Sequence, residues 1–271
     1  MKVMLIDVSK CNGCHNCQIA CKDEHVGNDW TPYAKPQPLT GHFWTRVIDI
    51  TRGTVPKVKV SYMHSLCQHC DDAPCITVCP QKAIYKREDG IVIIDPGKCA
   101  GNKRCKDACP YGVIYFNRDL NISQKCTFCA HLLDKGWKEP RCVDVCPTGA
   151  LRFDNEDKLG DLLEGAEILL PESKTKPRVY YKGIPKKFIA GALYDSEREE
   201  CLEGAKITLT DRTTGEKSST VSDDFGDFWV EGLGVGTFSL IIEKEGYQTK
   251  EIPAISTEMD VNLGDIELRR R

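Results

Sequence analysis

The sequence predicts a chain of two parts, a cysteine-rich α+β part built from a duplicated unit and an all-β antiparallel sandwich. Three observations predict this organisation. Fifteen of the sixteen cysteines fall between residues 11 and 146. A Cys-Pro pair, a turn and a β-prone run follow one another three times in that region, at "CPQKAIYK", "CPYGVIYFN" and "CPTGALRFD". Beyond residue 187, short runs of alternating apolar and polar residues recur at regular intervals.

Size and charge limit what the chain can be. Its 271 residues are enough for one large or two modest domains with hydrophobic cores. A formal net charge of -3 argues against a general nucleic-acid binder. No apolar run approaches the roughly 20 residues that a membrane helix needs, and the N-terminus lacks the pattern of a signal peptide. We therefore expect a cytoplasmic protein without a membrane anchor, whose thiols bind metal rather than form disulfides.

The fifteen clustered cysteines form four groups. They are group one (Cys11, Cys14, Cys17, Cys21), group two (Cys67, Cys70, Cys75, Cys79), group three (Cys99, Cys105, Cys109) and group four (Cys126, Cys129, Cys142, Cys146). Asn102 stands in group three where the spacing of group one would place a second cysteine.

The spacing within group one, C-x2-C-x2-C-x3-C, indicates iron-sulfur clusters. Three thiolates at such intervals on a looping backbone reach three corners of one cubane, whereas the fourth enters a short helix and points away. Two-cluster bacterial ferredoxins divide their ligands in this way, the last cysteine serving the other cluster. A zinc ribbon would need two C-x2-C pairs around one tetrahedral site. Triplets with a trailing cysteine occur here instead, so iron-sulfur ligation is the better interpretation.

Local patterns agree with a duplicated ferredoxin unit. "YKREDGIVIID" is typical of a β-hairpin turning at Glu88-Asp89-Gly90, and the repeated cysteine loop, short helix and strand indicate an internal duplication. We expect residues 1–155 to form a double ferredoxin-like 4Fe-4S domain with an insertion over 22–66. The proline- and aromatic-rich stretch of that insertion predicts a partner-docking surface or a packed loop.

The second part begins with a connecting segment. Residues 156–186 are expected to form a helix followed by a linker or extended arm. Residues 187–271 hold seven short alternating runs separated by turns such as "TTG", "DDFG" and "KEG", the pattern of an antiparallel β-sandwich. The run "LEGAKITL" with "TVSDDFGDFWVEGLGVGTFSLIIEKEGY" resembles the Cna-B or carboxypeptidase-regulatory type of domain, which implies docking or spacing. Cys201 is then an incidental thiol.

The order and spacing of the four cysteine groups resemble the iron-sulfur (beta) subunit of the dimethyl sulfoxide reductase family of molybdopterin enzymes. The resemblance covers roughly residues 1–155 and implies that group one pairs with group four and group two with group three. It implies three 4Fe-4S clusters with these ligands: Cys11, Cys14, Cys17 and Cys146 for cluster 1; Cys126, Cys129, Cys142 and Cys21 for cluster 2; Cys67, Cys70, Cys75 and Cys109 for cluster 3.

A fourth site would keep only Cys79, Cys99 and Cys105, with Asn102 in place of a ligand. An asparagine amide is a poor, neutral ligand beside a thiolate. Three outcomes stay open: an empty site, which we favour; a 3Fe-4S cluster; or a cubane with an unusual ligand. His15, His69 and His131 stand between ligands rather than at ligand spacing, so we expect them beside the metal centres or facing solvent.

No catalytic constellation can be defended in this sequence, so we expect no substrate chemistry on the chain itself. The resemblance implies an electron-transfer subunit of an oxidoreductase complex. Its partner would be a large molybdopterin-binding catalytic subunit that holds molybdenum on molybdopterin guanine dinucleotide. The sandwich and the degraded site most resemble the branch that moves a hydroxyl group between polyhydroxylated benzenes without external electrons. The alternatives are an electron-transfer subunit of another soluble molybdopterin oxidoreductase, and a free polyferredoxin with a β binding module.

Overall fold

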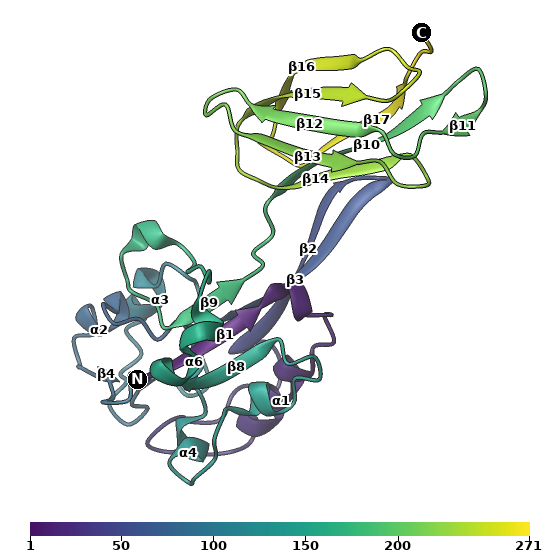
Figure 1. Ribbon diagram of the computed structural model, residues 1–271. Coiled ribbons are helices and arrows are strands. Elements are labelled where there is room, and N and C mark those ends of the chain that lie inside the picture. The colour runs from purple at the N-terminus through teal and green to yellow at the C-terminus, as the bar shows by residue number, and fades with distance from the viewer. The chain divides into compact units, whose positions relative to one another are not determined.

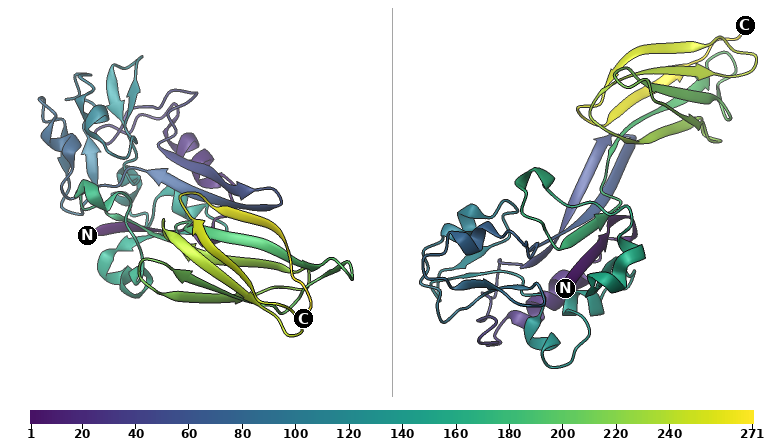
Figure 2. Two further views of the ribbon diagram at one scale, coloured as in Figure 1. Left: turned by 90° about the horizontal axis from the view of Figure 1, so that it is seen from above. Right: turned by 60° about the vertical axis from the view of Figure 1, so that its left-hand side comes forward.

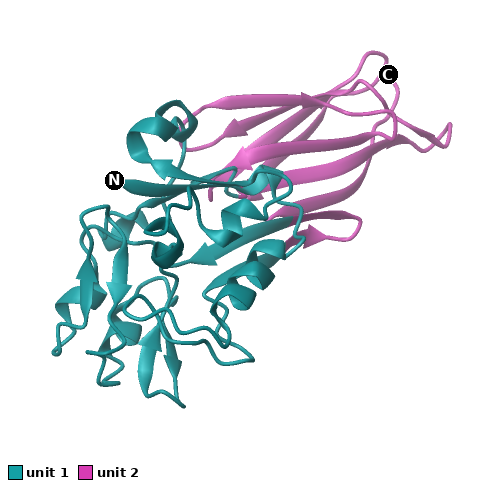
Figure 3. Cartoon of the chain, turned by 90° about the horizontal axis from the view of Figure 1, so that it is seen from below, with its two compact units in different colours: residues 1–50, 61–184 teal, residues 51–60, 185–271 magenta.

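The computed structural model describes residues 1–271 and divides them into two compact units (Figures 1 and 3). Unit 1 comprises Met1–Ile50 and Ser61–Ile184, and unit 2 comprises Thr51–Val60 and Pro185–Arg271. Among the helices, none has the length and apolar character needed to cross a lipid bilayer.

Unit 1 is organised around a small sheet with strand order β8-β1-β9. Its strands are β1 (Lys2–Asp7), β8 (Leu151–Asn155) and β9 (Val179–Lys182). β1 runs antiparallel to β8 and parallel to β9. The apolar run of β1 explains its central place, because Val3, Met4, Leu5 and Ile6 are all buried. The sheet therefore brings the two ends of the cysteine-rich region together.

Short helices, two short hairpins and the loops between them make up most of the rest of unit 1, and its cysteines lie in the helices and loops. The hairpins are β4 (Ile84–Lys86) with β5 (Val92–Ile94), and β6 (Tyr115–Asn117) with β7 (Ile122–Gln124). The helices are α1 (Asn16–His25), α2 (Pro74–Thr77), α3 (Arg104–Ala108), α4 (Ala130–Leu133), α5 (Arg141–Asp144) and α6 (Glu156–Leu163), with 3-10 turns at Val8–Lys10 and Pro171–Ser173. The predicted hairpin across Glu88-Asp89-Gly90 and the predicted helix after residue 155 are both confirmed.

Unit 2 is a sandwich of two four-stranded sheets (Figure 2). One sheet has the order β11-β10-β14, with β17 on the other edge of β10, and the second has the order β13-β12-β15-β16. The strands are β10 (Lys187–Asp195), β11 (Glu200–Cys201), β12 (Lys206–Asp211), β13 (Lys217–Val221), β14 (Asp227–Leu233), β15 (Thr237–Glu243), β16 (Lys250–Ser256) and β17 (Val261–Glu267). Inward side chains of both sheets, among them Ile189, Leu209, Phe228 and Leu240, form one core.

The expectation of a wholly antiparallel sandwich is wrong at one place. β17 runs parallel to β10, with Ile189 opposite Val261, whereas the other strand pairs of unit 2 are antiparallel. β16 and β17 belong to different sheets. β17 is not joined to its neighbour β10 by a hairpin. The chain reaches β17 from β16 in the other sheet, and this connection sets the direction of β17. Alternation in a sequence shows which residues face inward, but it does not show whether two neighbouring strands run parallel or antiparallel.

A long hairpin from the insertion contributes to unit 2. Its strands are β2 (Thr45–Thr54) and β3 (Lys57–Leu66), and its tip, residues 51–60, belongs to that unit. Arg52 pairs with Asp260 at 3.0 Å, and buried Lys57 pairs with Asp227. The Asn262 amide donates to the Thr54 carbonyl. These contacts join the tip to the sandwich although the paired residues are about 170 to 208 positions apart in sequence.

Candidate iron-sulfur sites

One cavity of unit 1 is lined by Cys11, Cys14, Cys17 and Cys146. The first three residues come from the loop and first turn of α1, and Cys146 follows α5. The loop depends on Gly13, whose φ is +71° and whose Cβ, if present, would lie 2.4 Å from the Tyr62 ring. The sequence folds in this way because only glycine allows both the backbone conformation and the close approach of the ring.

A second cavity is lined by Cys67, Cys70, Cys75 and Cys109, together with His69. Cys75 lies in α2, which begins at Pro74, a residue suited to the first turn of a helix. Cys109 directly follows α3. Residues from groups two and three therefore surround one space, although more than thirty positions separate Cys75 from Cys109 in sequence.

The third set, Cys21, Cys126, Cys129 and Cys142, is buried as a whole. Burial holds the pKa of Cys21 well above its usual range, and the neighbouring Cys126 and Cys129 raise it further. The pKa of Cys142 is likewise raised well above its usual range by burial, then by Cys129, Cys126 and Cys21. Cys17 and Cys21 lie one helical turn apart on α1, so one face of this helix serves both neighbouring sets.

Burial keeps most of these thiols protonated in the metal-free protein. It raises the pKa of Cys17, Cys75, Cys126 and Cys129 to about 12. Cys146 differs, because hydrogen bonds outweigh the effect of burial there and lower its pKa. They come from the backbone N–H groups of Leu151, Ala150 and Thr148 and from the Thr148 hydroxyl. Metal binding must release the protons of the thiols whose pKa is raised, since the thiolate is the ligand.

The surroundings of the thiols fit iron-sulfur clusters rather than single metal ions. No three His, Cys, Asp or Glu side chains converge closely enough to hold one ion. Two buried histidines line the cavities with unpartnered ring nitrogens, His64 with both nitrogens and His69 with Nε2. The Val92 N–H donates to His69 Nδ1 at 3.0 Å, so Nε2 carries the proton of the neutral ring. Soft thiolates with such donors nearby are the environment that iron-sulfur clusters use.

Cys79, Cys99 and Cys105 also lie near one another, since Cys99 and Cys79 both raise the pKa of Cys105 after burial. Ser123 lies between two of them. Its N–H donates to Cys99 Sγ at 3.4 Å, and its hydroxyl accepts from Cys105 Sγ at 3.3 Å. Asn102 is exposed, its amide donates to Gln81 and its carbonyl accepts from the Arg104 N–H at 3.0 Å. The Asn102 side chain is therefore engaged outside the thiols.

The sequence led us to expect His15, His69 and His131 beside the metal centres or facing solvent. His15 and His69 line the cysteine cavities, whereas His131 is buried with its Nε2 2.9 Å from Glu24 Oε1. Sequence reasoning missed His64, Ser123 and Lys125. His64 and Ser123 gave no signal, because the chain brings them to the thiols from outside the cysteine motifs. Lys125 could have been noticed as a cation directly before Cys126.

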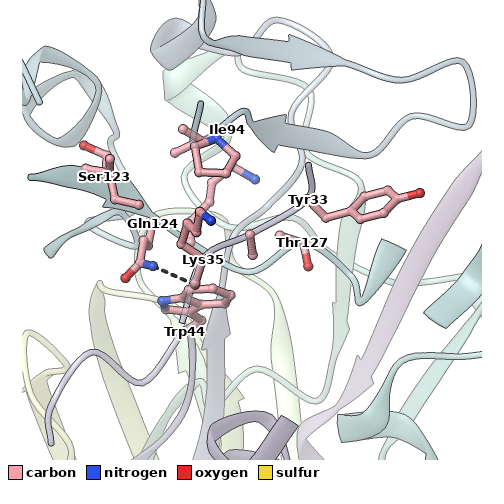
Figure 4. A pocket seen from close by; sticks show the side chains of 11 residues that line it. Tyr33, Lys35, Trp44, Ile94, Ser123, Gln124 and Thr127 are labelled. Carbon is pink, nitrogen blue, oxygen red and sulfur yellow. Dashed lines mark hydrogen bonds between the residues drawn. The ribbon is translucent and has the colours of Figure 1, made fainter. Parts of the chain in front are cut away.

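A further small cavity beside β7 holds no cysteine (Figure 4). Its lining includes Tyr33, Lys35, Trp44, Gln124 and Thr127, and the Gln124 amide donates to the Lys35 carbonyl at 2.8 Å. Its volume of about 10 Å³ leaves room for a water molecule at most. This place therefore packs the insertion against β7 and is no substrate site.

Two protein families match this chain. Residues 58–156 match the 4Fe-4S dicluster domain, and residues 189–269 match the carboxypeptidase regulatory-like domain. The first match shows an iron-sulfur protein, and the second agrees with the predicted type of sandwich.

Similar proteins include components of several oxidoreductases. The small subunit of pyrogallol hydroxytransferase from Pelobacter acidigallici is 39% identical, over 98% of both chains. The iron-sulfur subunit of arsenate respiratory reductase from Shewanella sp. (strain ANA-3) is 35% identical, over 66% of this chain and 94% of the relative. A tetrathionate reductase subunit from Salmonella typhimurium is 35% identical, over 69% of this chain and 74% of the relative. This chain therefore belongs to the iron-sulfur subunits of the dimethyl sulfoxide reductase family of molybdopterin enzymes, which transfer electrons and are not the catalytic chains.

Proposed function

We propose that this chain is the iron-sulfur subunit of a transhydroxylase that converts pyrogallol to phloroglucinol. The observation that carries the proposal is the similarity to the pyrogallol hydroxytransferase small subunit, which extends over 98% of both chains and so includes the sandwich. The similarity to the arsenate and tetrathionate reductase subunits spans about two thirds of this chain.

The chain would hold three 4Fe-4S clusters in two ferredoxin-like modules. Cluster 1 takes Cys11, Cys14, Cys17 and Cys146, cluster 2 takes Cys21, Cys126, Cys129 and Cys142, and cluster 3 takes Cys67, Cys70, Cys75 and Cys109. Support comes from the two cavities lined by complete ligand sets and from the mutual effects on pKa within the buried third set. When bound, such clusters take up and release single electrons.

The residues of this chain supply ligands, exclude water and donate hydrogen bonds. Apolar residues such as Val92, Val113 and Ile114 line the cavity of cluster 3. His64 and His69 present unpartnered ring nitrogens in two of the sites. Because hydrogen bonds and burial set the potentials of iron-sulfur centres, these side chains tune the electron path.

The site of Cys79, Cys99 and Cys105 stays without a cluster in this proposal. Asn102 forms hydrogen bonds with Gln81 and Arg104 and is exposed, which favours an empty fourth corner. A 3Fe-4S cluster there is the outcome that the experiment below distinguishes.

The partner would be a large catalytic subunit with molybdenum on molybdopterin guanine dinucleotide. Transfer of a hydroxyl group between polyhydroxylated benzenes needs no net external electrons. The clusters would then set or restore the redox state of the metal rather than carry a steady current. Residues 1–155 would serve as the cluster domain and residues 187–271 as the docking domain. Residues 156–186 would connect them, with β9 paired to β1 in the sheet of unit 1.

The test is the iron and molybdenum content of the native complex, purified without oxygen, with an EPR spectrum of the oxidised sample. We expect about twelve irons per molybdenum and no 3Fe-4S signal. About fifteen irons with that signal would place a three-iron cluster at the fourth site. Absence of molybdenum would contradict the partner.

Substrate class needs a separate measurement on the same complex. We expect conversion of pyrogallol without an external electron acceptor. A complex that contains molybdenum but turns over only with an electron donor or acceptor would be another soluble molybdopterin oxidoreductase.

A further inference from the structure

Four charged side chains of this protein are buried: Lys57, Lys125, Arg178 and Asp195. Three of them have partners of opposite charge. Lys57 pairs with Asp227, Arg178 with Asp71 at 2.6 Å, and Asp195 with Arg270 at 3.0 Å. Lys125 is 2% exposed and forms no ion pair with a carboxylate. A buried cation without a counter-charge is unfavourable, so this residue needs an explanation.

The Lys125 ammonium is held by backbone carbonyls alone. It donates to the carbonyl of Val92 and, at 3.0 Å, to that of Cys126. Cys126 belongs to the ligand set of cluster 2. The N–H of Val92 donates to His69, which lines the cavity of cluster 3. Lys125 therefore lies between two of the proposed clusters.

The effects of the Lys125 charge on neighbouring groups agree with this position. Although burial raises the pKa of Cys126 and of Cys75, Lys125 acts on both in the opposite direction. The pKa of His69 is lowered well below its usual range by burial, and then by Lys125 and Lys86. The cation thus favours negative charge in both ligand sets, while His69 stays neutral.

We propose that Lys125 is the counter-charge shared by clusters 2 and 3, which raises the reduction potentials of both relative to cluster 1. This inference rests on the proposed clusters. One electron added at either set increases the negative charge that faces the ammonium by one unit. The attraction between the ammonium and the added negative charge favours the reduced form directly.

The expected size follows from Coulomb's law. For a unit charge roughly 10 Å away at an effective dielectric constant of about 20, the ratio of reduced to oxidised cluster changes about tenfold. For a one-electron couple, a tenfold change corresponds to about 59 mV.

The experiment is a potentiometric EPR titration of the native complex and of its Lys125→Met variant, both purified without oxygen. We expect two of the three cluster midpoints to move to more negative potentials, and Lys125→Arg to keep them near the wild-type values. Lys57→Met is the matched control, since Lys57 is also buried but pairs with Asp227 in unit 2. It should leave the midpoints of all three clusters unchanged.

Unchanged midpoints in a Lys125→Met complex with full iron would overturn the inference, as would equal shifts in the Lys57→Met control. If Lys125→Met loses iron, Lys125→Gln and Lys125→Arg decide. If the Lys125→Arg complex keeps its iron and the Lys125→Gln complex does not, the site needs a positive charge, as the inference requires. If Lys125→Gln keeps its iron, or if Lys125→Arg also loses it, the site needs the shape of lysine rather than its charge, and the inference is overturned. A wild-type complex without iron-sulfur signals would instead overturn the proposed function itself.

Discussion

Cys21 connects two cysteine groups that are far apart in sequence. Its thiol lies with Cys126, Cys129 and Cys142, and burial together with Cys126 and Cys129 raises its pKa. The spacing of group one already indicated that its last cysteine serves a different cluster, because the helix turns that side chain away from the first three. The ligand role itself stays a prediction.

Replacing Cys21 by serine tests that role. A serine at this position should remove one corner of cluster 2, so the iron content should fall by about one to four irons while the other clusters remain. Iron analysis and EPR of the purified complex measure this. Cys201→Ser is the control, because Cys201 is exposed on β11. Full iron in Cys21→Ser would remove Cys21 from the ligand set.

His25 should make the stability of the protein depend on pH. It is buried on α1 against Trp44, and burial, then His131 and Lys22, lower its pKa to about 3. The unfolded chain binds a proton near pH 6.5 and the folded chain does not, so stability is present above that pH and is lost as pH falls. Between pH 7.5 and 5, His25 alone should cost about 2 kcal/mol.

Urea unfolding under argon at the two pH values measures this loss. His25→Phe keeps an aromatic ring beside Trp44 and cannot be protonated, so its stability should fall less between pH 7.5 and 5. If the stability of His25→Phe depends on pH as strongly as that of the wild type, titratable groups other than His25 cause the loss of stability.

Single residues can be predicted from a sequence where the signal is local. Cysteine spacing is set by the reach of a few backbone bonds, so it can be recognised in a sequence. The burial of Lys125 and the unpartnered nitrogens of His64 depend on segments that meet only in the fold. Lysine side chains are usually exposed unless they are paired with a carboxylate. No carboxylate close to Lys125 in the sequence indicates such a buried pair, so its burial could not be predicted.

At the scale of elements, the tip of the β2–β3 hairpin is the feature that sequence patterns did not place. The proline and aromatic residues of the insertion predicted a docking surface or a packed loop rather than a hairpin, and the partner of the tip depends on the ion pairs of Arg52 and Lys57 with Asp260 and Asp227. The hairpin β4–β5, in contrast, was predictable because its turn residues and both strands lie within eleven residues. Elements closed by local turns can be predicted, and long-range pairings cannot.

Gly53 offers a test of the tip. It has φ +86°, and a Cβ there would lie 2.3 Å from the Lys57 carbonyl and 2.7 Å from the Phe188 ring. We expect Gly53→Ala to destabilise the protein by about 3 kcal/mol, from backbone strain and overpacking together. Gly246→Ala is the matched control, with φ +82° and open space around the new methyl group, and should cost about 1 kcal/mol. Equal shifts of the urea midpoint in both variants would contradict a close-packed tip.

At the scale of the whole molecule, the two units share one hairpin, so they cannot be separated by a single cut. A chain ending at residue 184 keeps the proposed ligands and loses Asp227 and Asp260, the partners of the tip. We expect that chain to retain its iron, because the cavities of the clusters lie in unit 1. Amide hydrogen exchange should rise at residues 51–60 and stay slow in β1. Unchanged protection at 51–60 would show that the tip is ordered without unit 2.

The proximity of Cys21 and Cys142 in the fold has a consequence for the timing of cluster assembly. The two residues are 142 − 21 = 121 positions apart. At about 5–20 residues per second, the ribosome needs roughly 6 to 24 seconds to make the second after the first. During that interval the early thiols have no complete site to enter and are open to oxygen and to stray metal ions. On the proposed ligand sets, clusters 1 and 2 cannot be completed before Cys146 and Cys142 have been made, so the oxygen level during synthesis should affect how many molecules acquire their full set of clusters.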